Sequence, residues 1–297
     1  MFKLSVNYYS GFIAVLIAAF FWGTAGTAAS FSRGLNPIVL GTISVGFGGL
    51  IHAFLSSKSI LSNYQTLLNY KTELLLGVIA SICCPLFFYS SVSLAGVSIG
   101  TVLSIGCAPL FSFILEWLFD KQKLLLKWLI SFLFGITGVI LLSYTEGSNS
   151  SSNLVQSERM IGVLCGLLSS LSYASYSFIM RRLIHKGIDA RAAMGSIFGI
   201  CAVLVLPTLF ITGKNLLLYP VNLWVALYIP IVPMFLGYLF FSFGLKRIPA
   251  SQAMTLALVE IPVAALLATL LLGESLSLTS YLGLASLFLC VILLARK

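Results

Sequence analysis

The sequence predicts an all-helical integral membrane protein with ten transmembrane helices, built as two inverted repeats of five helices. Three observations support this fold class. The 297 residues are 59% hydrophobic and only 8% charged, with a mean hydropathy of +1.07, whereas soluble domains carry about 25% charged residues. Apolar stretches long enough to cross a bilayer recur along the chain. The same order of motifs also appears twice.

The apolar stretches are separated by short polar or glycine-containing breaks. A helix needs about 20 apolar residues to cross roughly 30 Å of hydrocarbon, where it satisfies its own backbone hydrogen bonds. The in-out alternation of a membrane β-strand is absent, for example from Leu124 to Leu142. The predicted spans are 11–31, 37–56, 73–94, 97–119, 124–144, 161–182, 192–212, 222–245, 250–272 and 278–295.

Two of these assignments need separate arguments. The first span continues without a small-residue cleavage site, so we expect a retained helix rather than a signal peptide. The third and fourth spans, 73–94 and 97–119, meet across a very short connection at residues 95–97. The corresponding segment of the second half, 246–249, reads Lys-Arg-Ile-Pro and is an obvious break, which is why the first pair is also separated.

Positive charge is distributed unequally between the predicted loops. If the N-terminus is cytoplasmic, only Arg33, Arg159 and Lys214 fall on the outer side, and all other Lys and Arg residues fall inside. Cytoplasmic loops of membrane proteins are enriched in Lys and Arg. Both termini are therefore predicted in the cytoplasm. This pattern explains the formal net charge of +9 without nucleic-acid binding.

The internal duplication defines the predicted domains. Residues 1–145 form the first repeat, 146–159 an external polar linker, and 160–297 the second repeat. Matching features, such as Pro109 and Pro262, keep a nearly constant separation. Because each copy has an odd number of spans, the second must enter the membrane from the opposite side. Many secondary transporters are built in this way. The alternative is a duplication that only enlarged a helical bundle.

Three segments carry a family resemblance. They are Phe21-Trp22-Gly23-Thr24-Ala25-Gly26-Thr27, Gly106-Cys107-Ala108-Pro109-Leu110-Phe111, and the run from Leu258 through Glu260, Ile261 and Pro262 to Leu272-Gly273-Glu274. Together they resemble the drug/metabolite transporter superfamily in its EamA-type branch, over nearly the whole chain. In that branch Pro directly follows Glu, whereas here Ile261 intervenes. The first half also has Phe119-Asp120 where Gly-Glu is expected.

The resemblance implies a transporter of small polar metabolites, commonly amino acids or related amines, often moved outward. It also implies a plasma membrane location, typically the bacterial inner membrane. Fold-level resemblance leaves the individual cargo open.

One acidic residue lies where a charge is least stable. Glu260 sits near the middle of the predicted span 250–272, where an acidic side chain costs about 2.5 kcal/mol or more on insertion scales. No Lys or Arg lies at a matching depth in another span. We therefore expect Glu260 to face a central cavity, where it binds a substrate ammonium group or exchanges protons. The alternative is a protonated Glu260 that holds helices together through a hydrogen bond to a neighbouring backbone or hydroxyl group.

Polar aromatic side chains are predicted to accompany Glu260. Ser169, Tyr173 and Tyr176 share one face of the span 161–182, and Trp22 is related to Tyr173 by the duplication. Aromatic faces beside a carboxylate suit an amine cargo through cation–π contacts. The alternative is that the rings only fill the bundle. The predicted binding residues are Glu260, Trp22, Tyr89, Tyr173, Tyr176, Tyr238 and Gln252.

Prolines at equivalent places in the two copies predict helix breaks. Pro109 and Pro262 each remove one helix hydrogen bond. The carbonyls freed near Ile105 and Leu258 either bend the helix or line a cavity. The predicted break and gating residues are Pro109, Pro262, Gly23 and Gly26.

The remaining polar residues indicate no cofactor, metal or catalytic centre. His52 and His185 lack partners at metal-ligand spacing, and no nucleotide-binding loop is present. Glu116, about one turn from the inner end of its span, is expected to reach interfacial water. The expected partners are a small-molecule substrate, the lipid bilayer and protons. The alternatives to a transporter are a non-transporting accessory protein or, less favoured, a membrane-embedded enzyme.

Overall fold

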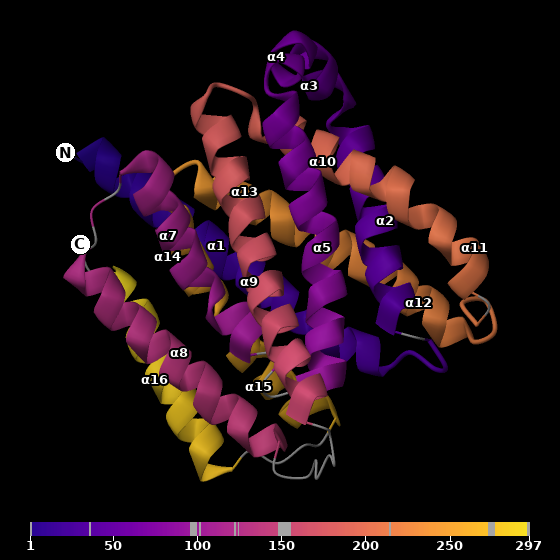
Figure 1. The fold of residues 1–297 in the computed structure, drawn as a ribbon, viewed down its shortest axis with the longest axis vertical. Helices are drawn as coiled ribbons and strands as arrows, with labels where there is room; N and C mark the ends of the chain where they lie inside the picture. The colour runs from indigo at the N-terminus through magenta and orange to yellow at the C-terminus, as the bar shows by residue number, and fades with distance from the viewer. Residues whose placement is uncertain are drawn as a thin grey trace.

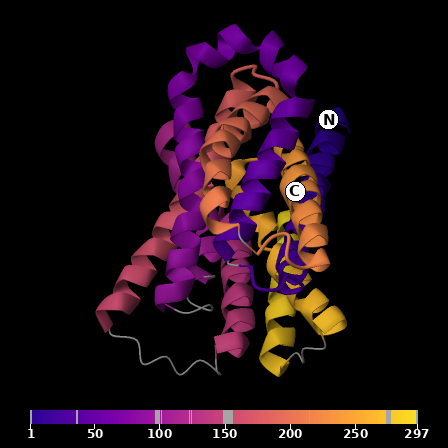
Figure 2. The same ribbon diagram turned by 90° about the vertical axis from the view of Figure 1, so that its right-hand side faces the viewer.

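The structure is a computed structural model that describes residues 2–35, 37–95, 100, 102–121, 123, 125–147, 156–213, 215–272 and 277–295. Throughout these ranges the regular structure is helical, with no strand. The helices run side by side as a single bundle (Figures 1 and 2). This confirms the predicted all-helical fold class.

Within the described residues, the first half of the chain contributes seven α-helices and one π-helix, which follow the predicted order closely. Two short helices, α3 and α4, were not predicted and fill the connection before α5. The elements are α1 (Phe2–Ser30), α2 (Pro37–Leu55), α3 (Ser57–Ser62), α4 (Tyr64–Asn69), α5 (Lys71–Ala95), the π-helix η1 (Val102–Gly106), α7 (Ala108–Asp120) and α8 (Leu126–Gly147). Residues 96–97 of the predicted connection at 95–97 and most of the linker 146–159 lie outside the described residues.

The second half is more interrupted, because three of its membrane-length stretches change helix type or break. Its elements are α9 (Gln156–His185), α10 (Ala190–Val205), the 3₁₀ turn η2 (Leu206–Thr208), α11 (Leu209–Thr212), α12 (Pro220–Ile229), the π-helix η3 (Pro230–Gly237), α13 (Tyr238–Leu245), α14 (Ala250–Ala257), α15 (Glu260–Leu272) and α16 (Leu278–Ala295). The stretch α12–η3–α13 contains Pro230 and Pro233, which interrupt the α-helical hydrogen-bond ladder.

The described residues contain eight helical stretches that are long and apolar enough to cross a membrane. They are Tyr8–Ser30, Ile38–Leu55, Lys71–Phe88, Leu103–Asp120, Met160–His185, Ala190–Thr212, Pro220–Leu245 and Ala250–Leu271. Two further apolar helical segments, Leu126–Leu141 and Leu278–Leu293, are shorter. The chain is therefore built as a multi-pass membrane protein, while the full number of ten spans stays a prediction.

The outer surface of the bundle fits a lipid environment. Large apolar side chains point outward from several helices, including Phe210 at 92% exposure, Phe54 at 79% and Trp224 at 73%. Exposed apolar surface of this extent is unusual for a protein in water. Small residues inside the bundle let helices approach closely: a Cβ on Gly138 would lie 2.8 Å from the Gly283 carbonyl oxygen. Such close packing is typical of helices in bilayers.

The longest helix contacts pair elements from the two halves of the chain. Helix α5 packs along α9, α2 along α10, and α8 along α16. Helix α1 runs through the bundle against η3, α13, α14 and α15. The cores of these contacts are closed by fully buried apolar side chains such as Ile43, Ile197 and Phe241. The interior between α1, α2, α5, α9 and η3 is where the bundle leaves space.

Hydrogen bonds fix the loops at the two ends of the bundle. At the end near the α1–α2 loop, Asn222 is fully buried. Its side chain accepts from the Arg33 N–H at 2.8 Å and donates to the carbonyls of Arg33 and Asn215, both at 3.0 Å. Asn215 in turn donates to the Gly34 carbonyl at 2.9 Å, and Gly34 has a φ of +64°, which favours glycine.

At the opposite end, Asp189 caps helix α10. Its carboxylate accepts from the N–H groups of Arg191 at 2.9 Å and Ala192 at 3.3 Å, and from the Ser59 hydroxyl at 2.7 Å. Partial burial alone would raise the pKa of Asp189, but these hydrogen bonds to the charged form outweigh it and hold the pKa below the ordinary value. The cap therefore joins α3 to the start of α10.

Candidate functional site

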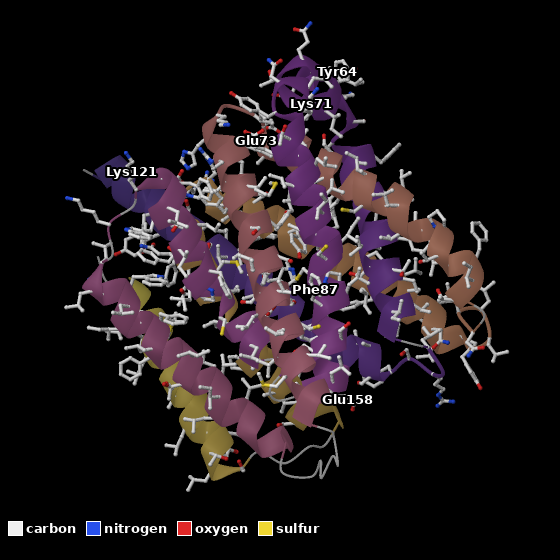
Figure 3. All side chains as sticks on the ribbon, in the orientation of Figure 1. Tyr64, Lys71, Glu73, Phe87, Lys121 and Glu158 are labelled. Atoms are coloured by element: carbon white, nitrogen blue, oxygen red, sulfur yellow. The ribbon has the colours of Figure 1, made fainter. Side chains whose placement is uncertain are left out.

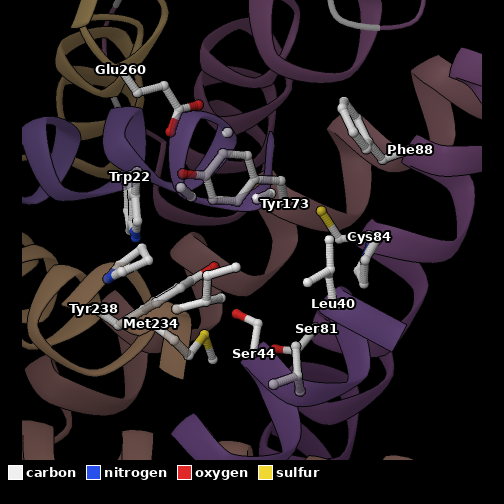
Figure 4. Close-up of a pocket in the computed structure, with 18 of the residues that line it drawn as sticks. Trp22, Leu40, Ser44, Ser81, Cys84, Phe88, Tyr173, Met234, Tyr238 and Glu260 are labelled. Atoms are coloured by element: carbon white, nitrogen blue, oxygen red, sulfur yellow. The ribbon is translucent and has the colours of Figure 1, made fainter. Parts of the chain in front are cut away.

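A cavity of about 660 Å³ lies inside the bundle and reaches the loop between α1 and α2. Figure 4 shows part of its wall. Most of the wall is apolar, with a few serines and a single carboxylate, a composition common in ligand sites. The lining residues are Trp22, Ala25, Gly26, Ala29, Ser30, Ser32, Leu35, Leu40, Gly41, Ser44, Val45, Ala80, Ser81, Cys84, Pro85, Phe88, Ser104, Ile105, Ser169, Tyr173, Tyr176, Phe198, Ile229, Pro233, Met234, Tyr238 and Glu260.

Four of the predicted aromatic residues meet in this wall. The Trp22 ring lies 5.0 Å from the Tyr238 ring and 6.3 Å from the Tyr173 ring, measured between centroids. Tyr176 extends the cluster, with its ring 5.7 Å from that of Tyr238. These side chains come from α1, α9 and α13, so residues far apart in the sequence form one aromatic surface. Offset and edge-on arrangements of this kind are the favourable ones.

Glu260 also lines the cavity, as the first residue of α15. Figure 4 shows its carboxylate directed toward the Tyr173 ring. Among the described residues, no side chain or backbone group forms an ion pair or hydrogen bond with this carboxylate. A negative charge at the start of a helix is favoured by the helix dipole. The helix start therefore stabilises the negative charge of Glu260, while its carboxylate oxygens form no hydrogen bond with the described residues.

The position of Glu260 follows from a helix break. Helix α14 ends at Ala257 and α15 begins at Glu260. Pro262 lacks an N–H, so the Leu258 carbonyl cannot be satisfied in the α-helical way. It accepts instead from the Ile261 N–H at 3.2 Å. The predicted break is present, but the Leu258 carbonyl is hydrogen-bonded rather than open to the cavity.

The equivalent place in the first half is also irregular. The π-helix η1 ends at Gly106, and α7 begins at Ala108 with Pro109 in its first turn. Pro109 and Pro262 are both buried and neither lines the cavity. Ile105, by contrast, does line it. The prolines thus shape the helices that form the wall, and their own rings lie outside it.

Several polar atoms at the wall are buried without a hydrogen-bond partner. They include the Trp22 indole Nε1, the Tyr176 hydroxyl and the Ser104 hydroxyl. Buried polar groups are normally paired, because an unpaired one loses its hydration without compensation. These three residues all line the cavity, but the atoms themselves have almost no accessible surface, so they are unpaired groups behind the wall. The sequence analysis did not single out Ser104, since isolated serines are common in membrane helices.

Two glycines of the α1 motif play different parts. A Cβ on Gly23 would lie 2.6 Å from the Val263 Cβ and 2.7 Å from the Glu260 carbonyl oxygen, so Gly23 allows α1 to touch the broken helix. A Cβ on Gly26 would meet nothing within 4 Å, and Gly26 lines the cavity. Gly23 is therefore a packing residue beside the break, whereas Gly26 borders open space.

Two predicted binding residues are not placed at the wall. Gln252 lies on α14 before the break, and its Oε1 accepts from the Tyr8 hydroxyl at 3.2 Å. It is not among the lining residues. The side chain of Tyr89 lies outside the part of the chain that is described.

The expectation that Glu116 reaches interfacial water is wrong, since its side chain is fully buried. Its carboxylate accepts from the Ala250 N–H and the Ser251 hydroxyl, both at 2.6 Å, and from the Ser251 N–H at 3.3 Å. Arg181 lies 3.5 Å away as an ion pair and also donates to the Ile248 carbonyl at 3.2 Å. Glu116 on α7 thus caps the start of α14 from a different helix.

Glu116 and its partners do not line the cavity. Arg181 follows Tyr173 by about two turns of α9, roughly 12 Å along the helix axis. The contact therefore lies beyond the aromatic wall, on the side away from the α1–α2 loop.

Comparisons with known proteins agree with these features. The chain is 32% identical over 293 residues to an uncharacterized transporter, YwfM, of Bacillus subtilis (strain 168), covering 97% of this chain and 94% of that protein. It is 25% identical over 291 residues to an uncharacterized transporter of Clostridium kluyveri, covering 92% and 89%.

A solved crystal structure shares the fold, with a TM-score of 0.79, 15% sequence identity and 96% coverage of both chains. The sequence model of the EamA-like transporter family matches residues 9–144 and, a second time, residues 160–296. Since these two matches span nearly the whole sequence, the chain belongs to the EamA-like transporter family, within the drug/metabolite transporter superfamily.

Proposed function

We propose that this protein is a secondary transporter that carries small amine-bearing metabolites, such as amino acids and related amines, outward by alternating access around Glu260. The observation that carries the proposal is a cavity inside the bundle that holds one unpaired carboxylate beside an aromatic wall. Carboxylates inside membrane bundles mark substrate and ion pathways. An ammonium group can bind the carboxylate and the ring faces together.

The proposed architecture is ten spans in two inverted repeats, 1–145 and 160–297, joined by the linker 146–159. The two separate family matches support it. The half-helices α7 and α15, both of 13 residues, support it as well. Helix α5 packs against α9 as α13 packs against α1, and α7 packs against α9 as α15 packs against α1. These reciprocal contacts are what a two-fold relation between inverted halves requires.

Both termini are proposed to lie on the cytoplasmic side of a plasma membrane, such as a bacterial inner membrane. Lys71 and Lys121 lie toward the end of the bundle that carries α3 and α4, and Glu158 lies toward the opposite end (Figure 3). The positive-inside bias then makes the α3–α4 end cytoplasmic.

In that orientation the cavity faces outward. It reaches Ser32 and Leu35 in the α1–α2 loop, while the contact of Glu116 with Arg181 and α14 lies on the cytoplasmic side. Alternating access requires the opposite arrangement as well, in which this inner contact opens and the outer mouth closes. Protons are the proposed counter-ligand of Glu260, since a carboxylate can hold a proton or an ammonium group.

Uptake in proteoliposomes tests the proposal. Purified protein should exchange a labelled amine or amino acid from a broad panel. Glu260→Gln should reduce the exchange by at least about tenfold, because it removes the one charged side chain among the described residues that line the wall. Glu158→Gln is the matched control, since this exposed carboxylate lies at the start of α9 away from the cavity. Equal activity of both variants and the unmodified protein would argue against Glu260 as the transport residue.

A further inference from the structure

The side chains around the cavity carry a single formal charge. Glu260 is the one acidic side chain among the described residues that line it, and no Lys, Arg or His contributes to that lining. The other polar contributions come from Ser, Cys, Tyr and Trp side chains, which are neutral hydrogen-bonding groups. The cavity therefore provides a counter-charge for one cationic group and none for an anionic group.

This asymmetry separates two chemical classes of amine. A zwitterionic amino acid would place its ammonium group at Glu260, as a simple amine would. Its carboxylate would then be desolvated beside apolar side chains, without a positive partner and near a second negative charge. Removing such a charge from water is unfavourable unless it is paired.

Two basic residues, Arg33 and His52, adjoin residues that line the cavity, but neither of them lines it. Arg33 follows the lining residue Ser32, but its side chain is exposed and outside the lining, and its backbone is held by Asn222. His52 is buried behind the wall, with its Nε2 3.3 Å from the Met234 carbonyl oxygen and its ring 5.5 Å from that of Phe198. Neither residue contributes to the described cavity surface.

The rest of the wall favours an apolar or aromatic body on the ligand. Trp22, Phe88, Tyr173, Phe198 and Tyr238 contribute rings to the lining. Ring faces attract both apolar groups and cations. The volume of about 660 Å³ falls within the range of roughly 300 to 1,000 Å³ that is typical of small-molecule sites. An amine with one or two rings therefore matches both the size and the surface.

We infer that the cavity selects organic monocations with an aromatic or apolar body and no carboxylate, in preference to the corresponding amino acids. This inference rests on the proposed transport function and narrows its substrate class. The lining serines, such as Ser44 and Ser81, add neutral hydroxyl groups that can bond a hydroxyl on the ligand body. They do not replace the missing positive charge.

Matched pairs of compounds test the selection directly. Thermal shift and competition for uptake would be measured for tyramine against tyrosine, phenethylamine against phenylalanine, and tryptamine against tryptophan. Within each pair the ring is the same and only the carboxylate differs. The amine should bind at least about tenfold more tightly, a modest fraction of the penalty for burying an unpaired charge. Tyrosol, which has a hydroxyl in place of the ammonium group, should bind at least about tenfold more weakly than tyramine.

Variants connect the preference to the cavity. Glu260→Gln should lower tyramine binding to the level of tyrosol, and Glu260→Asp, which keeps the charge, should restore part of it. A melting temperature for each variant in detergent separates lost binding from lost folding. Arg33→Gln should leave the preference unchanged, because its side chain lies outside the cavity lining.

The outcomes distinguish the inference from the transport function. If amino acids bind as tightly as their amines, or if Arg33→Gln abolishes amino-acid binding, the inference is overturned while transport stands. If none of these compounds and no member of a broader metabolite panel is bound or moved, the proposed function fails with it. Tight amine binding that depends on Glu260 supports both.

Discussion

The buried carboxylate of Glu116 allows a quantitative test of how the inner side of the bundle is held together. Replacing it with alanine removes the acceptor of two backbone N–H groups and one hydroxyl at the start of α14. Each buried donor left unpaired costs about 1 to 3 kcal/mol. The Arg181 side chain is 19% exposed, so water offsets part of the free energy lost with its ion pair to Glu116. We therefore expect Glu116→Ala to lower the free energy of unfolding by about 3 to 5 kcal/mol.

The partners of Glu116 should contribute unequally. The 2.6 Å contact with the Ser251 hydroxyl is a short charge-assisted hydrogen bond, whereas the Arg181 contact is longer, at 3.5 Å, and partly hydrated. A double-mutant cycle of Glu116→Gln with Ser251→Ala should give a coupling of about 1 to 3 kcal/mol. The cycle with Arg181→Gln should give less than about 1 kcal/mol.

Denaturant unfolding in detergent micelles, followed by tryptophan fluorescence, measures these energies, with Glu158→Ala as the exposed control. A loss below about 0.5 kcal/mol for Glu116→Ala would refute the reasoning, since that is the range of ordinary surface substitutions. A larger coupling to Arg181 than to Ser251 would also refute it. In that case the ion pair, and not the helix cap, would dominate the contact.

Four other substitutions have definite expected outcomes. Gly23→Ala should reduce transport and thermal stability, because its Cβ would clash with Val263 and with the Glu260 backbone. Gly26→Ala should fold normally and change only the affinity for bulky cargo, because its Cβ would meet nothing within 4 Å. Melting temperatures and competition assays measure both effects. Asp189→Asn should weaken the α10 cap by about 1 kcal/mol at neutral pH. Since its pKa is lowered by folding, the stabilisation of Asp189 is present above pH 3.8 and is lost as the pH falls below it. The difference between Asp189→Asn and the unmodified protein should therefore shrink in acid. Asn222→Ala should cost about 1 to 3 kcal/mol, because buried backbone groups in the outer loop lose their partner.

The sequence predicted the helices and much of the cavity for physical reasons. Apolar length determines a membrane helix almost by itself, which is why the end of span 250–272 agrees with that of α15. Glu260 could be found because a carboxylate in an apolar span needs an explanation. Trp22 and Tyr173 could be found because duplication places them at equivalent positions, and their rings do meet in the wall.

The remaining features depend on which helices face one another, which composition does not reveal. Glu116 was expected near water because its span was considered alone, whereas the start of α14 lies directly against it. Gln252 is a predicted binding residue, but its Oε1 accepts from the Tyr8 hydroxyl and it does not line the cavity. Ser104 and Cys84 look like ordinary packing residues until the wall is assembled. The π-helix η3 had a usable signal in Pro230 and Pro233, which lie close enough to distort consecutive turns.

The Asn222 contacts have a mechanical consequence for the mouth of the cavity. One side chain holds the backbone of Arg33 and of Asn215, so the ends of α1 and α11 are tied to the beginning of α12. The α1–α2 loop cannot close over the cavity as a flexible lid by itself, because bending it would break the buried hydrogen bonds with Asn222. If the proposed alternating access narrows this entrance, we expect α1 and α12 to tilt together, and the Trp22 ring on α1 to move with them.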